Sequence, residues 1–294
     1  MRELRQVGEH TWYVYCRNIF GFYQLNETDV CMIDTGRDPE DVEFAEQVMA
    51  EKGWKLKFIL NTHTHVDHIG GNEALMAHWK CPAYVTHIDR VFAEYEILEP
   101  SYMFGGKPSE AVCNAFLHPG DIGFQNIEDF QLPEGFEYIR MPGHTFGMIS
   151  IKTPDGVWFV GDSIMNSKAL EKYPFGYLTN VEDYLNNLET MKTMEGTYFI
   201  PSHGDSMGED IKPLAEANIA NINRHIDFIL QSCRDGKNLD LVVRDLFSEY
   251  SIKCNEIQYT LVASTARCYL TYLQDAGKLE CYGEDGFIKW KTVE

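Results

Sequence analysis

The chain has 294 residues, 44% of them hydrophobic, and a formal net charge of −20 at pH 7. This length is enough for a sizeable core and leaves room for a small second domain. Such a negative surface repels phosphate backbones and anionic lipid heads, and no stretch reaches the roughly 18 apolar residues of a membrane span. These features exclude a membrane protein and make nucleic acid a disfavoured partner.

The N-terminus and the cysteines indicate a cytoplasmic protein. Residues 1–16 contain no apolar run of signal-peptide length. The eight cysteines are scattered and never form a C-x-x-C pair, which argues against a thiolate zinc site. A chain of this length does not need a disulfide framework, so we expect reduced thiols.

The first ninety residues predict an α/β layered fold. The predicted strands are 11–17, 21–27, 29–36, 56–60 and 82–87, each rich in aromatic or β-branched residues or continuously apolar. A helix is predicted to begin after Asp38, which can cap it, and to end at Gly53. A second helix is predicted at 72–80, so strands and helices alternate as in layered α/β proteins.

Residues 88–135 interrupt this alternation, and we interpret them as an insertion or lid over the rest of the domain. They are aromatic, helical in patches and broken by glycine and proline. Strands return from residue 136, followed by a predicted helix at 181–194, a strand at 197–204 and a long helix from about 211 to 233. We therefore predict one catalytic domain over residues 1–233.

Residues 234–294 predict a small winged-helix-like domain of two helices and two short strands. Such modules often read DNA through a basic helix, but residues 235–294 contain ten acidic and only seven basic residues. We expect this domain to be structural, to line the active site or to form a homodimer. A ligand-sensing regulator that binds DNA is the alternative.

The segment "NTHTHVDHIGG" at 61–71 carries the densest functional signal. His63 and His65 are two positions apart, so in an extended segment both side chains point the same way and can reach one ion. Asp67 and His68 follow where the chain turns toward a helix, and they can reach a second ion. Four donors this close are hard to explain as solvated side chains, because protonated imidazoles would repel one another.

Three further candidate ligands follow apolar strands. His144 stands in "MPGHTFG", Asp162 in "FVGDS" and His203 in "IPSHGD". Open α/β sheets gather their functional groups at the carboxyl ends of strands. We therefore expect these side chains to converge on the histidine loop.

This set of motifs resembles the metallo-β-lactamase superfamily over roughly residues 10–230. The resemblance implies a four-layer αβ/βα sandwich with a metal site along one edge. It implies that one metal is held by His63, His65 and His144, and a second by Asp67, His68 and His203. Asp162 would bridge the two metals, and Asp34 in "MIDTG" would orient the histidine loop.

The expected cofactors are two divalent ions. Five imidazoles and two carboxylates without a thiolate suit zinc, with manganese or iron as alternatives. A hydroxide bridging two such metals is a nucleophile at neutral pH, and Asp67 is the catalytic candidate that orients it or passes its proton to the leaving group. We predict a metallo-hydrolase that cleaves an ester-type bond in a small molecule, with a thioester or a lactone favoured.

The substrate is less well specified than the metal site. "MPGHTFGMISI" and "VWFVGDSI" resemble the glyoxalase II branch of the superfamily, whereas the C-terminal tail resembles a lactamase-like branch that includes an endoribonuclease. An endoribonuclease or phosphodiesterase and a mononuclear-iron persulfide dioxygenase are therefore the alternatives. The candidate substrate contacts are Tyr102, Phe104, His118, Tyr173 and Tyr177.

Overall fold

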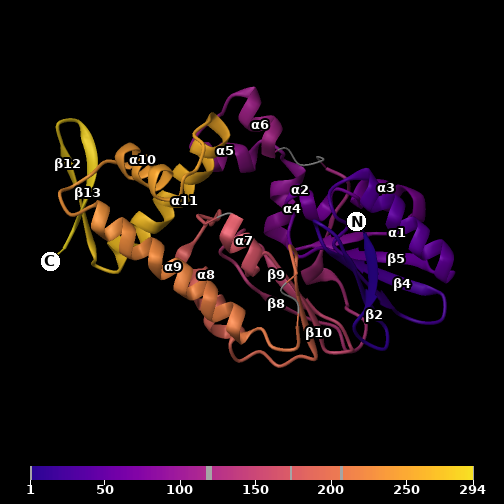
Figure 1. Cartoon of the computed structure of the whole chain (residues 1–294). Coiled ribbons are helices and arrows are strands. Elements are labelled where there is room, and N and C mark those ends of the chain that lie inside the picture. Colours follow the sequence, from indigo (N-terminus) through magenta and orange to yellow (C-terminus); the bar gives the residue numbers. More distant parts are fainter. Residues whose placement is uncertain (1, 117–120, 173, 206–207, 294) are drawn as a thin grey trace.

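Two β-sheets form the centre of the molecule (Figure 1). The computed structural model describes residues 2–116, 121–172, 174–205 and 208–293. The larger sheet has the strand order β1-β2-β3-β4-β5-β6-β7, and the smaller has the order β11-β10-β9-β8. The strands of the larger sheet are β1 (Glu3–Gln6), β2 (Thr11–Tyr15), β3 (Phe20–Gln24), β4 (Asp29–Ile33), β5 (Lys55–Leu60), β6 (Ala83–Val85) and β7 (Gln125–Asn126). Those of the smaller sheet are β8 (Glu137–Arg140), β9 (Ile149–Lys152), β10 (Val157–Gly161) and β11 (Tyr198–Pro201).

Three apolar clusters hold the layers together. Between the sheets, Ile33 and Leu60 of the larger one share a buried cluster with Ile149 and Phe159 of the smaller. The outer face of the larger sheet packs on α1 (Pro39–Lys52) and α3 (Asn72–Trp79). The outer face of the smaller sheet packs on α8 (Val181–Met191) and α9 (Lys212–Ser232). The order helix, sheet, sheet, helix is the predicted four-layer sandwich, which is therefore confirmed.

The functional residues follow strands that run parallel within each sheet. Strands β4 and β5 pair in parallel, and so do β10 and β11. The carboxyl ends of parallel neighbours meet at one edge of a sheet. Asp34 and the histidine loop follow β4 and β5, while Asp162 and His203 follow β10 and β11. Four distant segments of the chain are thereby brought to one edge.

In its described residues, the insertion predicted at 88–135 carries three short α-helices and a 3-10 helix, η1 (Ile127–Asp129), and it returns to the larger sheet as its edge strand β7. The α-helices are α4 (His87–Glu94), α5 (Leu98–Phe104) and α6 (Glu110–Phe116). Figure 1 shows α5 and α6 away from the sheets, next to the long C-terminal helix α11 (Glu256–Asp275), with which both are in contact. The insertion therefore joins the sandwich to the C-terminal part of the chain.

The C-terminal part consists of α10 (Leu239–Glu249), α11 and a hairpin of β12 (Leu279–Glu284) and β13 (Phe287–Thr292). This order of elements is the one expected from the sequence. One apolar cluster runs across residue 233, since it contains both Ile229 of α9 and Leu270 of α11. Among the described residues, no helix is long and apolar enough to cross a membrane.

His225 links the sandwich to the C-terminal part from a position that is only 1% exposed. Its Nε2–H donates to the carbonyl oxygen of Pro174, and its Nδ1 accepts from the hydroxyl of Tyr269 on α11 at 2.9 Å. Burial lowers the pKa of His225 to about 4. The imidazole is therefore neutral at pH 7 and serves a structural contact.

We expect protonation of His225 to make folding pH-dependent. The unfolded chain protonates this histidine near pH 6.5 and the folded chain only near pH 4, so stability is present above pH 6.5 and is lost as the pH falls toward 4. The loss amounts to about 3 kcal/mol. Urea unfolding of the wild type and of His225→Gln, measured from pH 7 to 4, should show the steeper decline in the wild type. Parallel curves would contradict this account.

Candidate metal centre

The histidine loop leaves β5 and enters a one-turn helix, α2 (Val66–Ile69). His63 and His65 lie in the loop, and Asp67 and His68 lie on α2. The turn packs tightly on its neighbours: a Cβ on Gly70 would stand 2.3 Å from the carbonyl oxygen of Arg37. Only glycine fits this close approach, which is why the motif ends in a glycine.

Among the described residues, three groups of ligand atoms converge, and the middle one, His63, His68 and Asp162, shares a histidine with each of the others. His63, His65 and His144 form the first set. Nδ1 of His65 lies 3.1 Å from Nε2 of His63 and 3.0 Å from Nε2 of His144. The three nitrogens are close enough to bind one ion. This is the set that the resemblance implied for the first metal.

Asp67, His68 and His203 form the second set. Nε2 of His203 lies 3.5 Å from Oδ2 of Asp67 and 3.3 Å from Oδ1 of Asp162. The other oxygen of Asp162, Oδ2, lies 3.5 Å from Nε2 of His144 in the first set. The Asp162 carboxylate thus stands between the two sets, as a bridging ligand would.

Each of the five imidazoles turns one nitrogen to the cluster and binds a partner outside it with the other. Where the partner is a carboxylate or a carbonyl, the outer nitrogen must carry the hydrogen, which leaves the inner one with a free lone pair. The outer partners are Thr62 Oγ1 for His63, Glu99 Oε1 for His65, Asp34 Oδ2 for His68, Tyr177 O for His144 and Arg17 O for His203. The arrangement fixes the tautomers that metal ligation requires.

Two further properties fit a metal. Nε2 of His68 is buried and has no hydrogen-bond partner among the described residues, although such atoms are rarely left unpaired. Burial lowers the pKa of His63 well below its usual value and that of His144 to about 4. Neighbouring carboxylates raise the pKa of the other three histidines: that of His65 to about 8, that of His203 to about 9 and that of His68 well above its usual value, so these must lose a proton when an ion binds. Neutral imidazoles at pH 7 are the form that binds metals. The residues present therefore fit a pair of divalent ions.

Asp34 supports the histidine loop through hydrogen bonds to Thr62 and His68. It is 3% exposed, and its carboxylate accepts from the backbone N–H and the hydroxyl of Thr62, both at 2.8 Å. The same carboxylate accepts from Nδ1–H of His68 at 2.9 Å. The Thr62 hydroxyl in turn accepts from Nδ1–H of His63 at 3.2 Å. Asp34 therefore orients one histidine directly and another through Thr62, in agreement with its predicted role.

Gly161, at the end of β10, allows Asp162 to approach the loop. Its φ of +58° lies in the left-handed region, and a Cβ there would stand 2.6 Å from the methyl carbon of Met148 and 2.9 Å from Cβ of Thr62. A side chain at this position would separate Asp162 from the histidines. The sequence "GD" is therefore a local requirement of the site.

Two acidic residues of the insertion belong to the site and were not predicted. Oε1 of Glu99 on α5 forms an ion pair with Nε2 of His65 at 2.7 Å. Asp89 on α4 accepts from the N–H of Gly147 and the hydroxyl of Thr145, in the loop that carries His144. Burial raises the pKa of Asp89 to about 6. No motif marks either residue, because each depends on how the insertion folds back.

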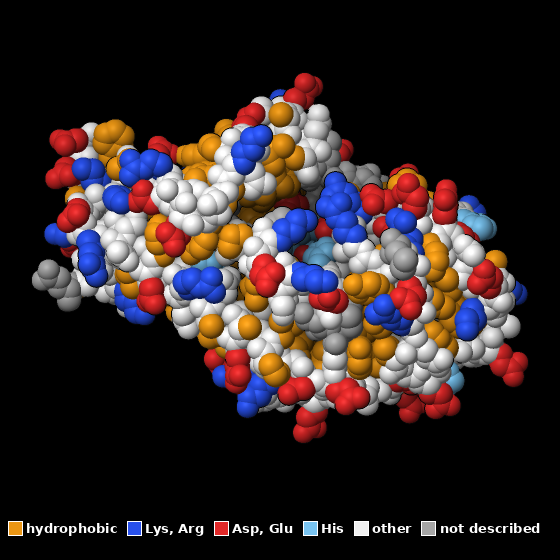
Figure 2. Space-filling view, in the orientation of Figure 1, with side chains coloured by type: hydrophobic (Ala, Val, Ile, Leu, Met, Phe, Trp, Pro, Cys, Tyr) orange, Lys and Arg blue, Asp and Glu red, His pale blue; other side chains and the backbone are white. Residues whose placement is uncertain are grey.

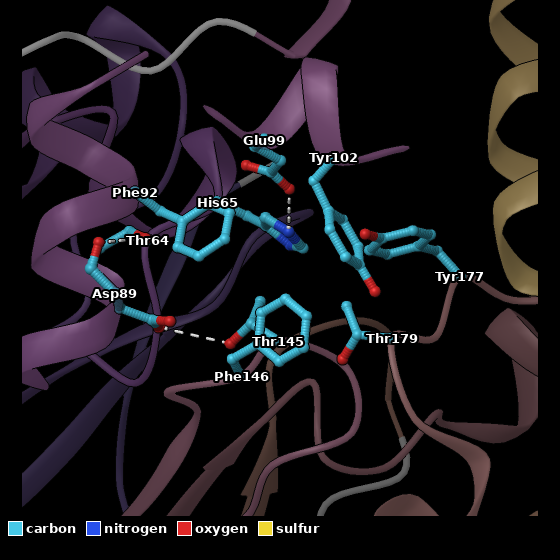
Figure 3. Close-up of a pocket in the computed structure, with 10 residues that line it drawn as sticks. All are labelled: Thr64, His65, Asp89, Phe92, Glu99, Tyr102, Thr145, Phe146, Tyr177 and Thr179. Carbon is cyan, nitrogen blue, oxygen red and sulfur yellow. Dashed lines mark hydrogen bonds and ion pairs between the residues drawn. The ribbon is translucent and has the colours of Figure 1, made fainter. Parts of the chain in front are cut away.

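A narrow apolar pocket adjoins His65, and Figure 3 shows its side chains. It is lined by Thr64, His65, Asp89, Phe92, Glu99, Tyr102, Thr145, Phe146, Tyr177 and Thr179. A second cavity of about 490 Å³ lies between the catalytic part and α11, and Tyr102 and Thr179 line both. Figure 2 shows a hollow in this region with histidine (pale blue) at its floor and Lys and Arg (blue) beside it.

The candidate substrate contacts lie in different places. Tyr102 and Tyr177 line the pocket at His65. Phe104, the last residue of α5, is exposed and is not among the lining residues of either cavity. His118 and Tyr173 lie outside the described residues. The pocket also contains aromatic residues that were not predicted, Phe92 and Phe146.

Comparisons with known proteins show which families this chain is similar to. The chain is 24% identical to a Drosophila melanogaster protein named "Beta-lactamase-like protein 2 homolog" over 258 residues, which cover 84% of this chain and 79% of the relative. It is 31% identical over 172 residues to "Probable metallo-hydrolase YflN" of Bacillus subtilis, covering 54% and 64%. It is 45% identical over 130 residues to a hydroxyacylglutathione hydrolase of Brucella anthropi, covering 43% and 40%.

Solved structures show the same fold. A beta-lactamase domain protein from Burkholderia ambifaria superimposes with a TM-score of 0.74 at 17% identity, covering 99% of this chain and 94% of that one. The sequence profile of the metallo-beta-lactamase superfamily matches residues 17–203, which carry every candidate metal ligand. The chain therefore belongs to the metallo-beta-lactamase superfamily and is a metallo-hydrolase.

Proposed function

We propose that this protein is a dinuclear metallo-hydrolase that cleaves an ester-type bond in a small molecule, with a thioester favoured over a lactone. The observation that carries the proposal is the position of Asp162 between two sets of three ligand atoms. Zinc is the metal we expect, and manganese or iron would also suit these ligands. Bound there, two divalent ions would lower the pKa of water and polarise the substrate carbonyl.

The residues of the chain supply orientation and proton transfer. The outer hydrogen bonds keep the five imidazoles in the ligand tautomer. We assign Asp67 the role of orienting the attacking water and passing its proton to the leaving group. The aromatic side chains of Phe92, Tyr102 and Tyr177 would exclude bulk water and pack on the acyl part of the substrate.

Two features favour a thioester over other substrates. Relatives of this chain include hydroxyacylglutathione hydrolases. The net charge of −20 opposes a polyanionic RNA substrate. A persulfide dioxygenase would need only one iron, whereas the two histidines of the second set, His68 and His203, also have hydrogen-bond partners outside the cluster. The eight free cysteines suit a reducing cytoplasm.

A substrate panel tests this function. The purified protein, with its metals counted, is assayed against acyl thioesters, lactones, a phosphodiester and a cephalosporin, and oxygen consumption is followed with a persulfide. We expect hydrolysis of thioesters to have the highest kcat/KM. Turnover of the phosphodiester alone would establish the endoribonuclease alternative, and oxygen uptake would establish the dioxygenase.

We also propose that the cavity beside α11 holds the part of the substrate that does not react. Thr271→Trp would fill this cavity with an indole from an exposed position on α11. We expect it to raise KM by about tenfold for thioesters with a bulky leaving group, and far less for a short one, which corresponds to about 1.4 kcal/mol of binding. Asn223→Trp, on the exposed face of α9, is the matched control. An equal effect on both substrates would exclude this use of the cavity.

A further inference from the structure

Glu99, in the insertion, contacts His65 in the way that Asp34, in the core, contacts His68. His68, in the second ligand set, donates Nδ1–H to the buried carboxylate of Asp34 at 2.9 Å. Nε2 of His65, in the first set, forms an ion pair with Oε1 of Glu99 at 2.7 Å. Each set thus contains one histidine backed by a carboxylate. Asp34 follows a central strand, whereas Glu99 comes from α5.

The contact is largely buried, unlike an ordinary surface ion pair. Glu99 is 8% exposed, and the side chain of His65 is 18% exposed. Figure 3 shows Glu99 above the imidazole, on the side opposite to the loop of Thr145. The opposite tautomer of His65 would place a hydrogen on Nδ1, which lies only 3.1 Å from Nε2 of His63 and 3.0 Å from Nε2 of His144. In that tautomer, Nδ1 has no lone pair with which to bind an ion.

We infer that Glu99 is a positioning residue through which the insertion sets the metal affinity of the first ligand set. Its carboxylate holds the proton on Nε2 of His65, keeps the lone pair of Nδ1 directed at the cluster and makes that nitrogen more basic. The first set contains three imidazoles and no carboxylate, so the Glu99 carboxylate, in contact with the outer nitrogen of His65, adds the negative charge that favours a divalent cation. The inference rests on the proposed metal centre.

Glu99→Gln tests this role, because glutamine has the same shape and can still accept a hydrogen bond but carries no charge. Zinc affinity is measured by competition with a chromophoric chelator. We expect the dissociation constant of one of the two zinc ions to rise about 10- to 100-fold and that of the other to stay within about threefold. Excess zinc should restore kcat, with KM unchanged. Glu96→Gln, an exposed neighbour in the insertion, is the control and should match the wild type.

The possible outcomes separate this role from the proposed function. Wild-type affinity of Glu99→Gln for both ions would overturn the inference while leaving the metal centre intact. Weaker binding of both ions together with a lower melting temperature would also overturn it, since that is the result of a general loss of structure. A wild-type protein that binds no zinc, manganese or iron would instead end the proposed function. Glu99→Asp, whose shorter side chain keeps the charge, should show an intermediate affinity if charge and reach both contribute.

Discussion

Asp162→Ala is expected to abolish turnover without unfolding the protein. The carboxylate of Asp162 lies 3.5 Å from a nitrogen of the first ligand set and 3.3 Å from one of the second, so its loss disrupts both sets at once. It also removes a negative charge that would offset the charge of two divalent ions. We expect kcat/KM to fall at least about 1,000-fold, or about 4 kcal/mol of transition-state stabilisation. Steady-state kinetics with the best substrate of the panel measure the effect.

The control for this variant is Asp235→Ala, which removes an exposed carboxylate near the end of α9. It should retain full activity, and the circular dichroism spectra of both variants should match that of the wild type. His65→Ala is expected to behave as Asp162→Ala does. Full activity in Asp162→Ala or in His65→Ala would remove the assignment of the site.

Removal of bound metal is expected to lower thermal stability together with activity. An ion that binds only the folded chain stabilises it by RT ln(1 + [L]/Kd), which is about 4 kcal/mol at a thousandfold excess over Kd. For a chain of this size, such a change shifts the melting temperature by on the order of 10 °C. Differential scanning calorimetry before and after dialysis against a chelator measures the shift.

Addition of metal then shows whether the effect is specific. Zinc, manganese or iron at a slight excess should restore both the melting temperature and turnover, while magnesium should not, because five of the seven ligands are imidazoles. In Asp162→Ala, the chelator should shift the melting temperature much less than in the wild type. A chelator that leaves both stability and turnover unchanged would contradict a role for metal.

The candidate metal ligands could be brought together from the sequence because they stand at strand ends. A strand end places its next residues at one edge of a sheet whatever the details of packing, so His144, Asp162 and His203 could be assigned to one site from their neighbours in sequence. The spacing within the histidine loop added local evidence. The fold could also be predicted, because apolar strands and capped helices leave local patterns in the sequence.

Other features depend on long-range packing and left no local signal. Strand β1 has the sequence "ELRQ", which lacks apolar alternation, and it forms only because β2 offers it a free edge. Helix α7 (Ser167–Lys172) buries no residue and so has no periodic pattern. Glu99 reaches His65 only because α5 lies between the metal site and α11.

The aromatic residues after Asp162 also show that a local sequence pattern does not predict long-range packing. Tyr177 lines the pocket at His65, whereas Phe175, two positions earlier, is buried against His225 and Tyr269. The sequence presents both as aromatic residues of one loop. Which of them faces the substrate depends on the docking of α11, because that helix contributes the surface on which Phe175 packs.

The most direct test of the dinuclear centre is to count and locate its ions. Metal analysis of the purified protein, combined with anomalous diffraction at the zinc, manganese and iron edges, gives both stoichiometry and position. We predict two ions per chain, one among His63, His65 and His144 and one among Asp67, His68 and His203, with Asp162 touching both. Crystals that stay empty after soaking in all three metals, or that hold ions elsewhere, would contradict the account.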